Sequence, residues 1–402
     1  MTRRFLVWVH RWVGLLMAAF LIVVGATGSL LAFFPELNHW LTPDIHPGLP
    51  AVMKLDAAAL ASRAEAIVPQ ARATAIYYAF MDTVMIGMEA QPNAPPLDFD
   101  QLYLDPVSGE ELGRLTWGAL PKSPKEIMPF IYSLHYSLAL GNVGMWVLGI
   151  LAIAWTIDCF VGFYLTLPLP ARSNGRSFFA RWTPAWRVKL GSSVYRINFD
   201  LHRAGGLWLW VMLLIVAWSS VYMNMDGFYT RAMRLFFDYD STLYFRTMEG
   251  VQREDRAPMS WNEAQETALR LMDEQAHANG FAVLRPMELS IDRASGLYRY
   301  RVRSSRDIGD KYGQTTVWFD ANSGALRKLG LPTGQRAANT VTTWIFELHK
   351  ANVFGLPYKI FVSAFGLVVV MLSITGVYIW WRKRQARLAH VRRTAARPAP
   401  AE

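Results

Sequence analysis

The sequence is poor in the residues that several common kinds of site require. Cys159 is the only cysteine among 402 residues, so the chain can form no internal disulfide and no cysteine-based metal cluster. The Cys-x-x-Cys-His pattern of covalent haem is absent, as are the Gly-x-Gly-x-x-Gly and Gly-Lys-Ser/Thr loops of dinucleotide and ATP sites. Charged residues make up only 18%, against about 25% in an average soluble domain. These deficits argue against a disordered chain and against a typical soluble enzyme.

Apolar residues are abundant instead, at 52% of the chain, and the mean hydropathy is +0.15. They gather in four stretches that hold no charge except Asp158: residues 13–34, 144–168, 204–223 and 360–381. At 1.5 Å per residue, about 20 residues cover the roughly 30 Å of a hydrocarbon core. Buried helices of a soluble protein are the alternative, but four such lengths favour membrane spans. We expect the first to be an uncleaved signal anchor, because it exceeds the apolar part of a signal peptide.

Lysine and arginine gather in the first 11 residues, in the loop 169–198 and in the tail after Trp381. The positive-inside rule places such segments in the cytoplasm, so we expect both termini there. Residues 35–134 are acidic overall and residues 223–350 are nearly balanced, which fits parts that face outward. The net charge of +10 is therefore a topology signal, and no nucleic-acid partner is expected.

The two outward segments are long enough for small folded modules, and both show the same order of expected elements. The first is predicted to hold a helix over residues 55–68 and strands over 73–80, 84–89 and 102–105. In the second, Ser260 and Glu263 form a capping box that opens a helix to residue 278, before strands over 283–291, 297–303 and 315–320. Each module ends in an Asp-x-x-Ser-Gly turn, at residues 105–109 and 320–324.

The predicted fold is an α-helical membrane bundle of four spans with two periplasmic α+β modules, built by internal duplication. The expected parts are the N-terminus and first span (1–34), a module (35–130), an outer histidine segment and second span (131–168), a basic cytoplasmic loop (169–198), the third span (199–223), a second module (224–340), a second histidine segment and fourth span (341–381), and a basic tail (382–402).

Four of the eight histidines occupy equivalent places in the two halves. His10 and His202 precede an arginine at the cytoplasmic ends of spans one and three, and His135 and His349 follow a leucine at the outward ends of spans two and four. Two histidines on different helices at one membrane face can hold a haem iron from both sides. A single interfacial histidine more often bonds a headgroup or the backbone, so the residues alone leave both interpretations open.

Other polar and small residues in the spans have candidate roles. Asp158 is costly to place in a membrane, and it is a candidate proton acceptor from a quinol or a hydrogen-bond partner of a neighbouring helix. Small residues let helices approach closely, and the glycines expected to do so are Gly14, Gly141, Gly144, Gly205 and Gly206. The remaining histidines are interpreted as incidental: His39, His46, His277 and His390.

The ordered repetition of these short motifs resembles the PepSY-associated transmembrane family of bacterial inner-membrane proteins. The motifs are His10-Arg11-Trp12-Val13-Gly14-Leu15, Leu134-His135, Leu348-His349 and Val377-Tyr378-Ile379-Trp380-Trp381, together with the two Asp-x-x-Ser-Gly turns. Two features depart from the pattern. Asp158 is not expected in the family, and Ala204-Gly205 stands where the first half has Trp12-Val13.

The resemblance implies an enzyme, a haem-dependent ferric-siderophore reductase with two non-covalent, bis-His haem b groups. It implies His10 and His202 as the inner iron ligands and His135 and His349 as the outer ones, with no separate catalytic residue. Electrons would come from a quinol or a cytoplasmic donor, and reduction in the periplasm would release Fe(II) from the siderophore. Two alternatives stay open: a non-enzymatic anchor or regulator of a periplasmic protein, and a siderophore or metal transporter built from parallel repeats.

Overall fold

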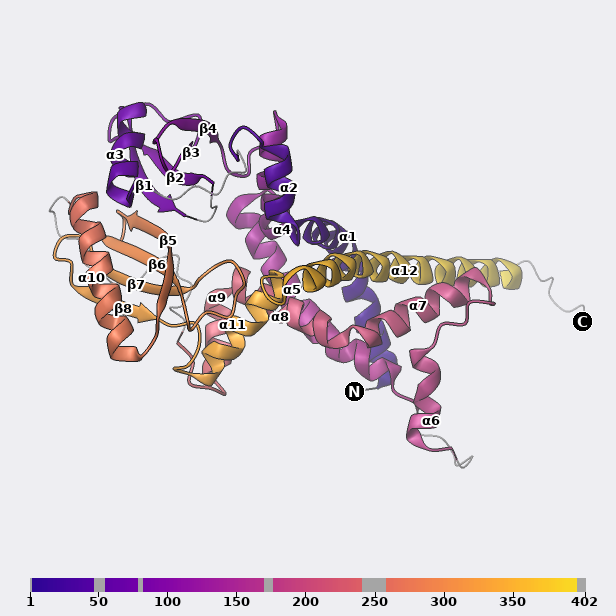
Figure 1. Ribbon diagram of the computed structural model, residues 1–402. Helices are drawn as coiled ribbons and strands as arrows, with labels where there is room; N and C mark the ends of the chain where they lie inside the picture. The colour runs from indigo at the N-terminus through magenta and orange to yellow at the C-terminus, as the bar shows by residue number, and fades with distance from the viewer. Residues whose placement is uncertain (1, 47–54, 79–81, 170–175, 241–257, 396–402) are drawn as a thin grey trace, which may run out of the picture. The chain divides into compact units, whose positions relative to one another are not determined.

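The computed structural model describes residues 2–46, 55–78, 82–169, 176–240 and 258–395, and it forms two compact units. The membrane unit comprises Met1–Ala32, Leu134–Met225 and Ile360–Glu402. The sheet unit comprises Phe33–Ser133 and Asp226–Lys359. Each unit is therefore assembled from segments that are far apart in the sequence (Figure 1).

The sheet unit is built on one antiparallel sheet of eight strands in the order β4-β3-β2-β1-β5-β6-β7-β8. The strands are β1 (Ala71–Tyr77), β2 (Val84–Ala90), β3 (Gln101–Leu104), β4 (Glu111–Leu115), β5 (Val283–Asp292), β6 (Leu297–Ser304), β7 (Thr315–Asp320) and β8 (Leu326–Gly330). β1 pairs with β5, with Ile76 opposite Leu289, so the two stretches predicted as separate modules share one sheet. This pairing covers an edge that each four-stranded half would otherwise expose.

Two helices, α3 (Ala57–Ile67) and α10 (Trp261–Asn279), lie side by side on one face of this sheet (Figure 1). The apolar residues of these helices and of the strands that face them form one core, which includes Leu60, Ile76, Leu289 and Phe319, each at most 1% exposed. The expected capping box is present, because the Ser260 side chain accepts from the Glu263 amide at the start of α10. The other helices of the sheet unit and its border are α2 (Phe34–Leu41), α4 (Ile127–Ser137), α9 (Asp226–Arg234) and α11 (Ala337–His349), with the 3-10 turn Pro124–Glu126.

All six expected strands are present, although β4 and β8 were not predicted. Residues 79 and 80 of the first expected strand lie outside the described residues. The two predicted turns share one bonding pattern: Asp105 Oδ1 accepts from the amides of the second and third residues after it, at 2.8 and 2.7 Å, and Asp320 Oδ1 does so at 3.0 and 2.9 Å. Each turn closes on a glycine with positive φ, Gly109 or Gly324, which suits a residue without a Cβ.

The membrane unit contains α1 (Arg3–Leu31), α5 (Gly141–Thr166), α7 (Val194–Trp208), α8 (Trp210–Asn224) and most of α12 (Gly355–Ala395), with short helices at Phe178–Trp182 and Thr183–Trp186. Among the described residues, α1, α5 and α12 are long and apolar enough to cross a membrane, and α7 with α8 would make a fourth span if the bent pair counts as one. The chain is therefore a membrane protein with a folded α+β unit.

The third predicted span is not one straight helix. It is bent by 70° between α7 and α8, at Leu209. Two tryptophans beside the bend are held by different partners. The Trp208 indole donates to the Trp186 carbonyl at 3.1 Å, and the Trp210 indole donates to the Cys159 carbonyl at 2.9 Å. The Gly205-Gly206 pair just before the bend has low helix propensity, which lowers the cost of breaking the helix there.

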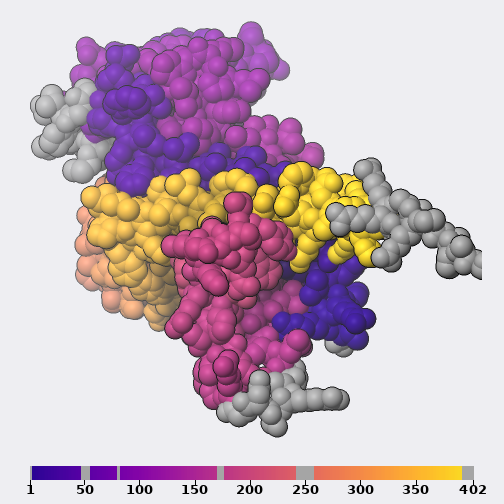
Figure 2. Space-filling view, turned by 90° about the vertical axis from the view of Figure 1, so that its right-hand side faces the viewer, coloured from indigo at the N-terminus to yellow at the C-terminus, as the bar shows by residue number. Residues whose placement is uncertain are grey.

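The helices of the membrane unit expose apolar side chains outward and pack closely within. α5 exposes Trp146, Ile150, Ile157 and Phe160, at helical spacing, as a surface facing lipid would. Gly25 of α1 and Gly366 of α12 lie so close that a Cβ on Gly366 would be 2.6 Å from the Gly25 carbonyl oxygen. The part of the chain that contains α7 lies against α12 on the face seen in Figure 2. A Cβ on Gly205, a buried residue of α7, would lie 3.2 Å from Met371 Cε of α12.

Candidate functional site

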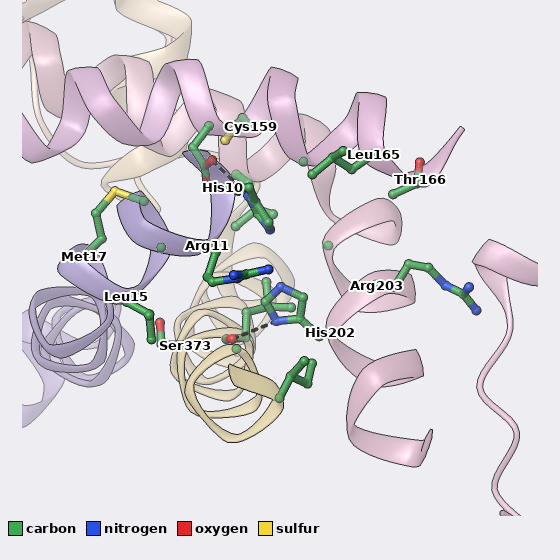
Figure 3. A pocket seen from close by; sticks show the side chains of 18 of the residues that line it. His10, Arg11, Leu15, Met17, Cys159, Leu165, Thr166, His202, Arg203 and Ser373 are labelled. Carbon is green, nitrogen blue, oxygen red and sulfur yellow. Dashed lines mark hydrogen bonds and ion pairs between the residues drawn. The ribbon is translucent and has the colours of Figure 1, made fainter. Parts of the chain in front are cut away.

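A cavity of about 470 Å³ lies inside the membrane unit, between α1, α5, α7, α8 and α12. Its walls are mainly apolar and aromatic, and they include Met17, Trp155, Phe163, Leu213 and Val369. His10, His202 and Asp158 line the same cavity, as Figure 3 shows for the two histidine rings. A mainly apolar cavity with a few convergent polar groups is the usual form of a cofactor or ligand site.

His10 of α1 is oriented by α5. Its Nδ1 lies 2.9 Å from both carboxylate oxygens of Asp158. A carboxylate only accepts hydrogen bonds, so Nδ1 carries the proton and the Nε2 of a neutral ring keeps a lone pair. One turn further along α5, Gly162 faces the ring: a Cβ there would lie 3.4 Å from His10 Cε1.

His202 of α7 is oriented in the same manner by α12. Its Nδ1 lies 2.9 Å from the Leu372 carbonyl oxygen and 3.2 Å from Thr375 Oγ1. The Nδ1–H therefore donates to the carbonyl, and Nε2 again keeps its lone pair. Gly376 leaves room for the ring, because a Cβ there would lie 3.2 Å from His202 Cε1.

The two imidazoles are close enough to share one metal ion. Their ring centres are 6.1 Å apart, with an angle of 61° between the planes. If one ion lies between the two rings and bonds one nitrogen of each at about 2 Å, the ring centres lie about 6 Å apart. Within the part of the chain that the structure describes, neither Nε2 has a hydrogen-bond partner, so both lone pairs are available to a ligand.

The cavity also has cationic side chains, Arg3, Arg11, Arg203 and Lys383. Arg203 donates to Asp200 at 2.8 Å, a carboxylate that Arg196 shares. Among the described residues, Arg11 and Lys383 form no ion pair, and Lys383 is exposed. A ligand with an apolar body and acidic substituents would satisfy both the walls and these charges.

The predicted outer histidines lie in different units. His135 of α4 has its Nδ1 3.0 Å from Thr27 Oγ1, and the Thr27 hydroxyl donates to the Val23 carbonyl at 2.8 Å, so its oxygen can accept from Nδ1–H. A Cβ on Gly28 would lie 3.0 Å from His135 Cε1. His349 ends α11 in the sheet unit, and its pairing with His135 stays a prediction.

The model of the PepSY-associated TM region matches residues 7–383 of this chain. The chain belongs to the PepSY-TM family. No curated protein matches the chain. The family membership that the sequence motifs predicted is therefore confirmed, and it covers both the membrane unit and the sheet unit of this PepSY-TM protein.

The structure brings together some of the residues that the sequence singled out in this PepSY-TM chain. His10, His202 and Asp158 meet at one cavity, and the hydrogen bond of Asp158 to a neighbouring helix was one of its two predicted roles. Its role as a proton acceptor stays a prediction. The expectation for the glycines was partly wrong, because a Cβ on Gly14, Gly141 or Gly206 would meet no atom within 4 Å. The expectation holds for Gly144 and Gly205, since a Cβ on Gly144 would meet the Ser137 carbonyl oxygen and a Cβ on Gly205 would meet Met371. Gly25 and Gly366, which were not predicted, also allow close approach.

Several groups that shape the site were not found from the sequence. The Leu372 carbonyl that bonds His202 could not be predicted, because every residue has a backbone carbonyl. A glycine four residues after a polar residue can be seen in the sequence. Asp158 and Gly162 are such a pair, and both contact His10. The histidines interpreted as incidental include two, His39 and His46, that the structure places beside Asp82 in the sheet unit.

Proposed function

We propose that this PepSY-TM protein is an inner-membrane haem protein that carries electrons to a ferric siderophore in the periplasm. The single observation that supports this function best is the pair His10 and His202. Both rings have Nδ1 on an acceptor, both keep an Nε2 lone pair, and their centres lie 6.1 Å apart at one apolar cavity. A histidine that binds a metal through one ring nitrogen characteristically donates a hydrogen bond from its other ring N–H to such an acceptor.

The residues around the cavity fit haem b. His10 and His202 would hold the iron from two sides, and the aromatic and aliphatic walls would cover the macrocycle. Arg11 and Lys383 would pair with its two propionates, since both are cations without an ion-pair partner among the described residues. When bound, haem b supplies a one-electron Fe(III)/Fe(II) couple.

The chain's own groups tune and orient this site. The Asp158 carboxylate makes His10 a more basic ligand and places negative charge near the iron, which favours the oxidised form. The Leu372 carbonyl is neutral, so it makes His202 a more basic ligand to a smaller extent. Gly162 and Gly376 limit where each ring can lie.

A second haem site at His135 and His349 completes the proposed path across the membrane. His135 shows the same local design as the inner pair, with Nδ1 on an acceptor of α1 and a glycine of α1 against its ring. We place the basic termini and the loop 169–198 in the cytoplasm and the sheet unit in the periplasm, where it would hold the ferric chelate. The two like halves, with the same turn at Asp105 and Asp320, fit an internal duplication.

The first experiment is the visible spectrum of detergent-purified protein, oxidised and after dithionite, with the haem-to-protein ratio. About two haems per chain with sharp reduced α and β bands are expected for bis-His ligation at both sites. His10→Ala and His202→Ala should each remove half of the haem. His277→Ala is the control, because His277 is an exposed residue of α10 outside the membrane unit.

Reductase activity has its own test. Protein reduced with stoichiometric dithionite, without excess reductant, is mixed anaerobically with a ferric trihydroxamate and a ferrous chelator. One electron leaves each reduced haem, so one Fe(II) per haem should be trapped while the haem bands return to the oxidised form. A colourless protein from haem-sufficient cells would contradict the proposal and favour an anchor or a transporter. A red protein that yields no Fe(II) would retain the haem but contradict this substrate.

A further inference from the structure

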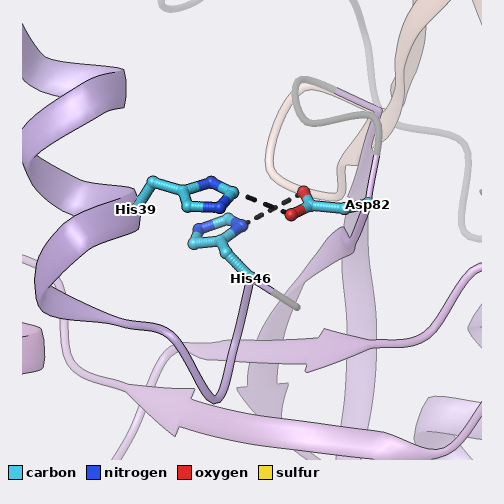
Figure 4. A group of neighbouring side chains, drawn as sticks. All are labelled: His39, His46 and Asp82. Atoms are coloured by element: carbon cyan, nitrogen blue, oxygen red, sulfur yellow. Dashed lines mark hydrogen bonds and ion pairs between the residues drawn. The ribbon is translucent and has the colours of Figure 1, made fainter. Parts of the chain in front are cut away.

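Three potential metal ligands, none of them a proposed iron ligand, meet in the sheet unit. His39 lies on α2, His46 follows the turn after that helix, and Asp82 lies just before β2 (Figure 4). The turn is fixed by local bonds: Thr42 Oγ1 donates to the Asn38 carbonyl at 2.6 Å, and the His46 amide donates to the Thr42 carbonyl at 3.0 Å. It folds His46 back against His39, with the two rings stacked and their centres 5.1 Å apart.

The ligand atoms lie nearly as close to one another as the ligands of one metal ion do. His46 Nδ1 is 3.2 Å from Asp82 Oδ1, and His39 Nδ1 is 3.8 Å from Asp82 Oδ2. One ligand atom from each residue lies within 4.8 Å of the others. Tetrahedral Zn²⁺ with bonds of about 2.1 Å holds its ligand atoms about 3.4 Å apart, so a small shift of His39 completes three positions.

Burial differs among the three residues in the way that an accessible metal site needs. The side chains of His46 and Asp82 are 1% and 9% exposed, and the side chain of His39 is 48% exposed. The two inner ligands are thus held in place by the fold, while the third can close over an ion that arrives from solvent. The fourth position would be filled by water.

Asn38 supplies an independent observation. It is 5% exposed, its Nδ2 lies 3.4 Å from His46 Nε2, and its Oδ1 has no hydrogen-bond partner among the described residues. A buried acceptor without a partner is costly. When a metal takes Nδ1 of His46, Nε2 must carry the proton, and a half-turn of the amide then lets Oδ1 accept it. Asn38 Oδ1 would thereby accept from the Nε2–H of the metal-bound ring and orient it.

We propose that His39, His46 and Asp82 bind one divalent first-row transition-metal ion of the zinc type. A set of two imidazoles and one carboxylate favours Zn²⁺ over Mg²⁺ and Ca²⁺. The ion would tie α2 and the turn after it to the start of β2. None of these three residues is a proposed haem ligand, so the site can be tested separately from the proposed electron transfer.

The test is isothermal titration of the full-length, EDTA-treated protein in detergent with Zn²⁺. The wild type should bind one Zn²⁺ per chain. In His39→Ala and in Asp82→Asn this binding should be lost, or its affinity should fall at least tenfold. His39 is the safest position to change, because its side chain is half exposed. His39→Cys should restore binding, because a thiolate also ligates Zn²⁺. Asn38→Ala should weaken binding about 10–100-fold, as loss of a bond to a ligating histidine does.

The matched control is His277→Ala. His277 and Asp273 form an exposed pair, 3.6 Å apart, that is not part of a three-residue ligand group among the described residues, so its loss should leave the affinity unchanged. Saturating Zn²⁺ should also raise the Tm of the wild type but not that of His39→Ala. Absence of Zn²⁺ binding in the wild type, or equal affinity in the wild type and His39→Ala, would overturn the proposal. Both results are independent of the haem content of the same samples.

Discussion

His10 Nδ1 lies 2.9 Å from both carboxylate oxygens of Asp158, the charged residue of the second expected span. Asp158 is 7% exposed, and a buried carboxylate without a partner would be expensive in a membrane. The contact therefore answers two questions together. It accounts for an acidic residue within that span, and it fixes the tautomer and direction of the histidine that we propose as an iron ligand.

Asp158→Asn tests this relationship directly. The amide keeps the shape of the side chain and an acceptor oxygen but removes the charge, so haem should still bind. The midpoint potential of the inner haem should rise by about 60 mV, a tenfold change for a one-electron couple, because the oxidised iron loses a nearby negative charge. A potentiometric titration of the purified protein measures this shift.

Asp273→Asn is the control for that titration, since Asp273 is an exposed residue of α10. Asp158→Ala should go further and weaken haem binding about 10–100-fold, because His10 loses its orienting acceptor. If Asp158→Asn leaves the potential of the wild type unchanged, the carboxylate does not act through His10. If Asp158 also accepts a proton during reduction, the variant should lose a pH dependence of the potential that the wild type shows.

The glycines that face the histidine rings give a second prediction. A Cβ on Gly376 would lie 3.2 Å from His202 Cε1, and a Cβ on Gly28 would lie 3.0 Å from His135 Cε1. Gly376→Val and Gly28→Val should each displace one ring and remove about half of the haem, while the helical content by circular dichroism stays near the wild type. The haem-to-protein ratio provides the measurement.

Gly191→Ala serves as the control, because a Cβ at Gly191 would meet no atom within 4 Å. Full haem content in Gly376→Val would show that the ring position of His202 does not matter for binding. Loss of all haem in either variant would instead contradict two sites that bind independently.

The sequence predicts best what depends on local pattern. The strands, the capping box at Ser260 and the Asp-x-x-Ser-Gly turns follow from alternation, capping and turn chemistry within a few residues, and all are present. The meeting of His10 and His202 was predicted from their equivalent places in the two halves. The structure brings them to one cavity.

What the sequence could not predict depends on packing between distant segments. The pairing of β1 with β5 joins the two predicted modules, and nothing in either strand specifies its partner. The bend at Leu209 lies between two tryptophans that bond to other segments, Trp208 and Trp210. His46 and Asp82 are 36 residues apart in the sequence, without metal-motif spacing, so only the fold shows that they meet.

The third prediction concerns pH and the sheet unit. Glu288 of β5 is fully buried and forms ion pairs with Arg299 and Arg301 of β6, the latter at 2.8 Å. Burial acts to raise the pKa of Glu288, but Arg301 and Arg299 outweigh it and hold the pKa below its ordinary value. A carboxyl group with a lowered folded-state pKa stabilises fully above its unfolded pKa of about 4.3, and this stability is lost as the pH falls through the folded value.

Glu288→Gln should therefore lower the free energy of unfolding by about 3 kcal/mol at pH 7, because two arginines lose their buried partner. The difference from the wild type should shrink as the pH falls below about 4. Hydrogen exchange of β5 and β6 in the full-length protein at several pH values follows both effects. Glu274→Gln, which removes an exposed pair with Arg270, should change stability by less than about 1 kcal/mol. A pH-independent difference for Glu288→Gln would contradict the role of its charge.

The last prediction compares the two equivalent turns. Asp105 and Asp320 each accept two backbone amides, but Asp320 also pairs with Arg327 at 2.7 Å, whereas Asp105 has no ion pair among the residues that the structure describes. Arg327 is the largest cause that lowers the pKa of Asp320, and the amide of Ser108 is the largest for Asp105. The same turn is thus held by two kinds of interaction in one half and by one kind in the other.

Asp105→Ala and Asp320→Ala should both lower the Tm, each through loss of turn hydrogen bonds worth about 1 kcal/mol apiece, with the larger loss at Asp320. Asparagine separates the two contributions, because its side-chain oxygen still accepts the amides but carries no charge. Asp105→Asn should therefore stay close to the wild type, and Asp320→Asn should fall between the wild type and Asp320→Ala. Equal Tm values for Asp320→Asn and the wild type would show that Arg327 adds no stability, and the two turns would then be equivalent in energy as well as in geometry.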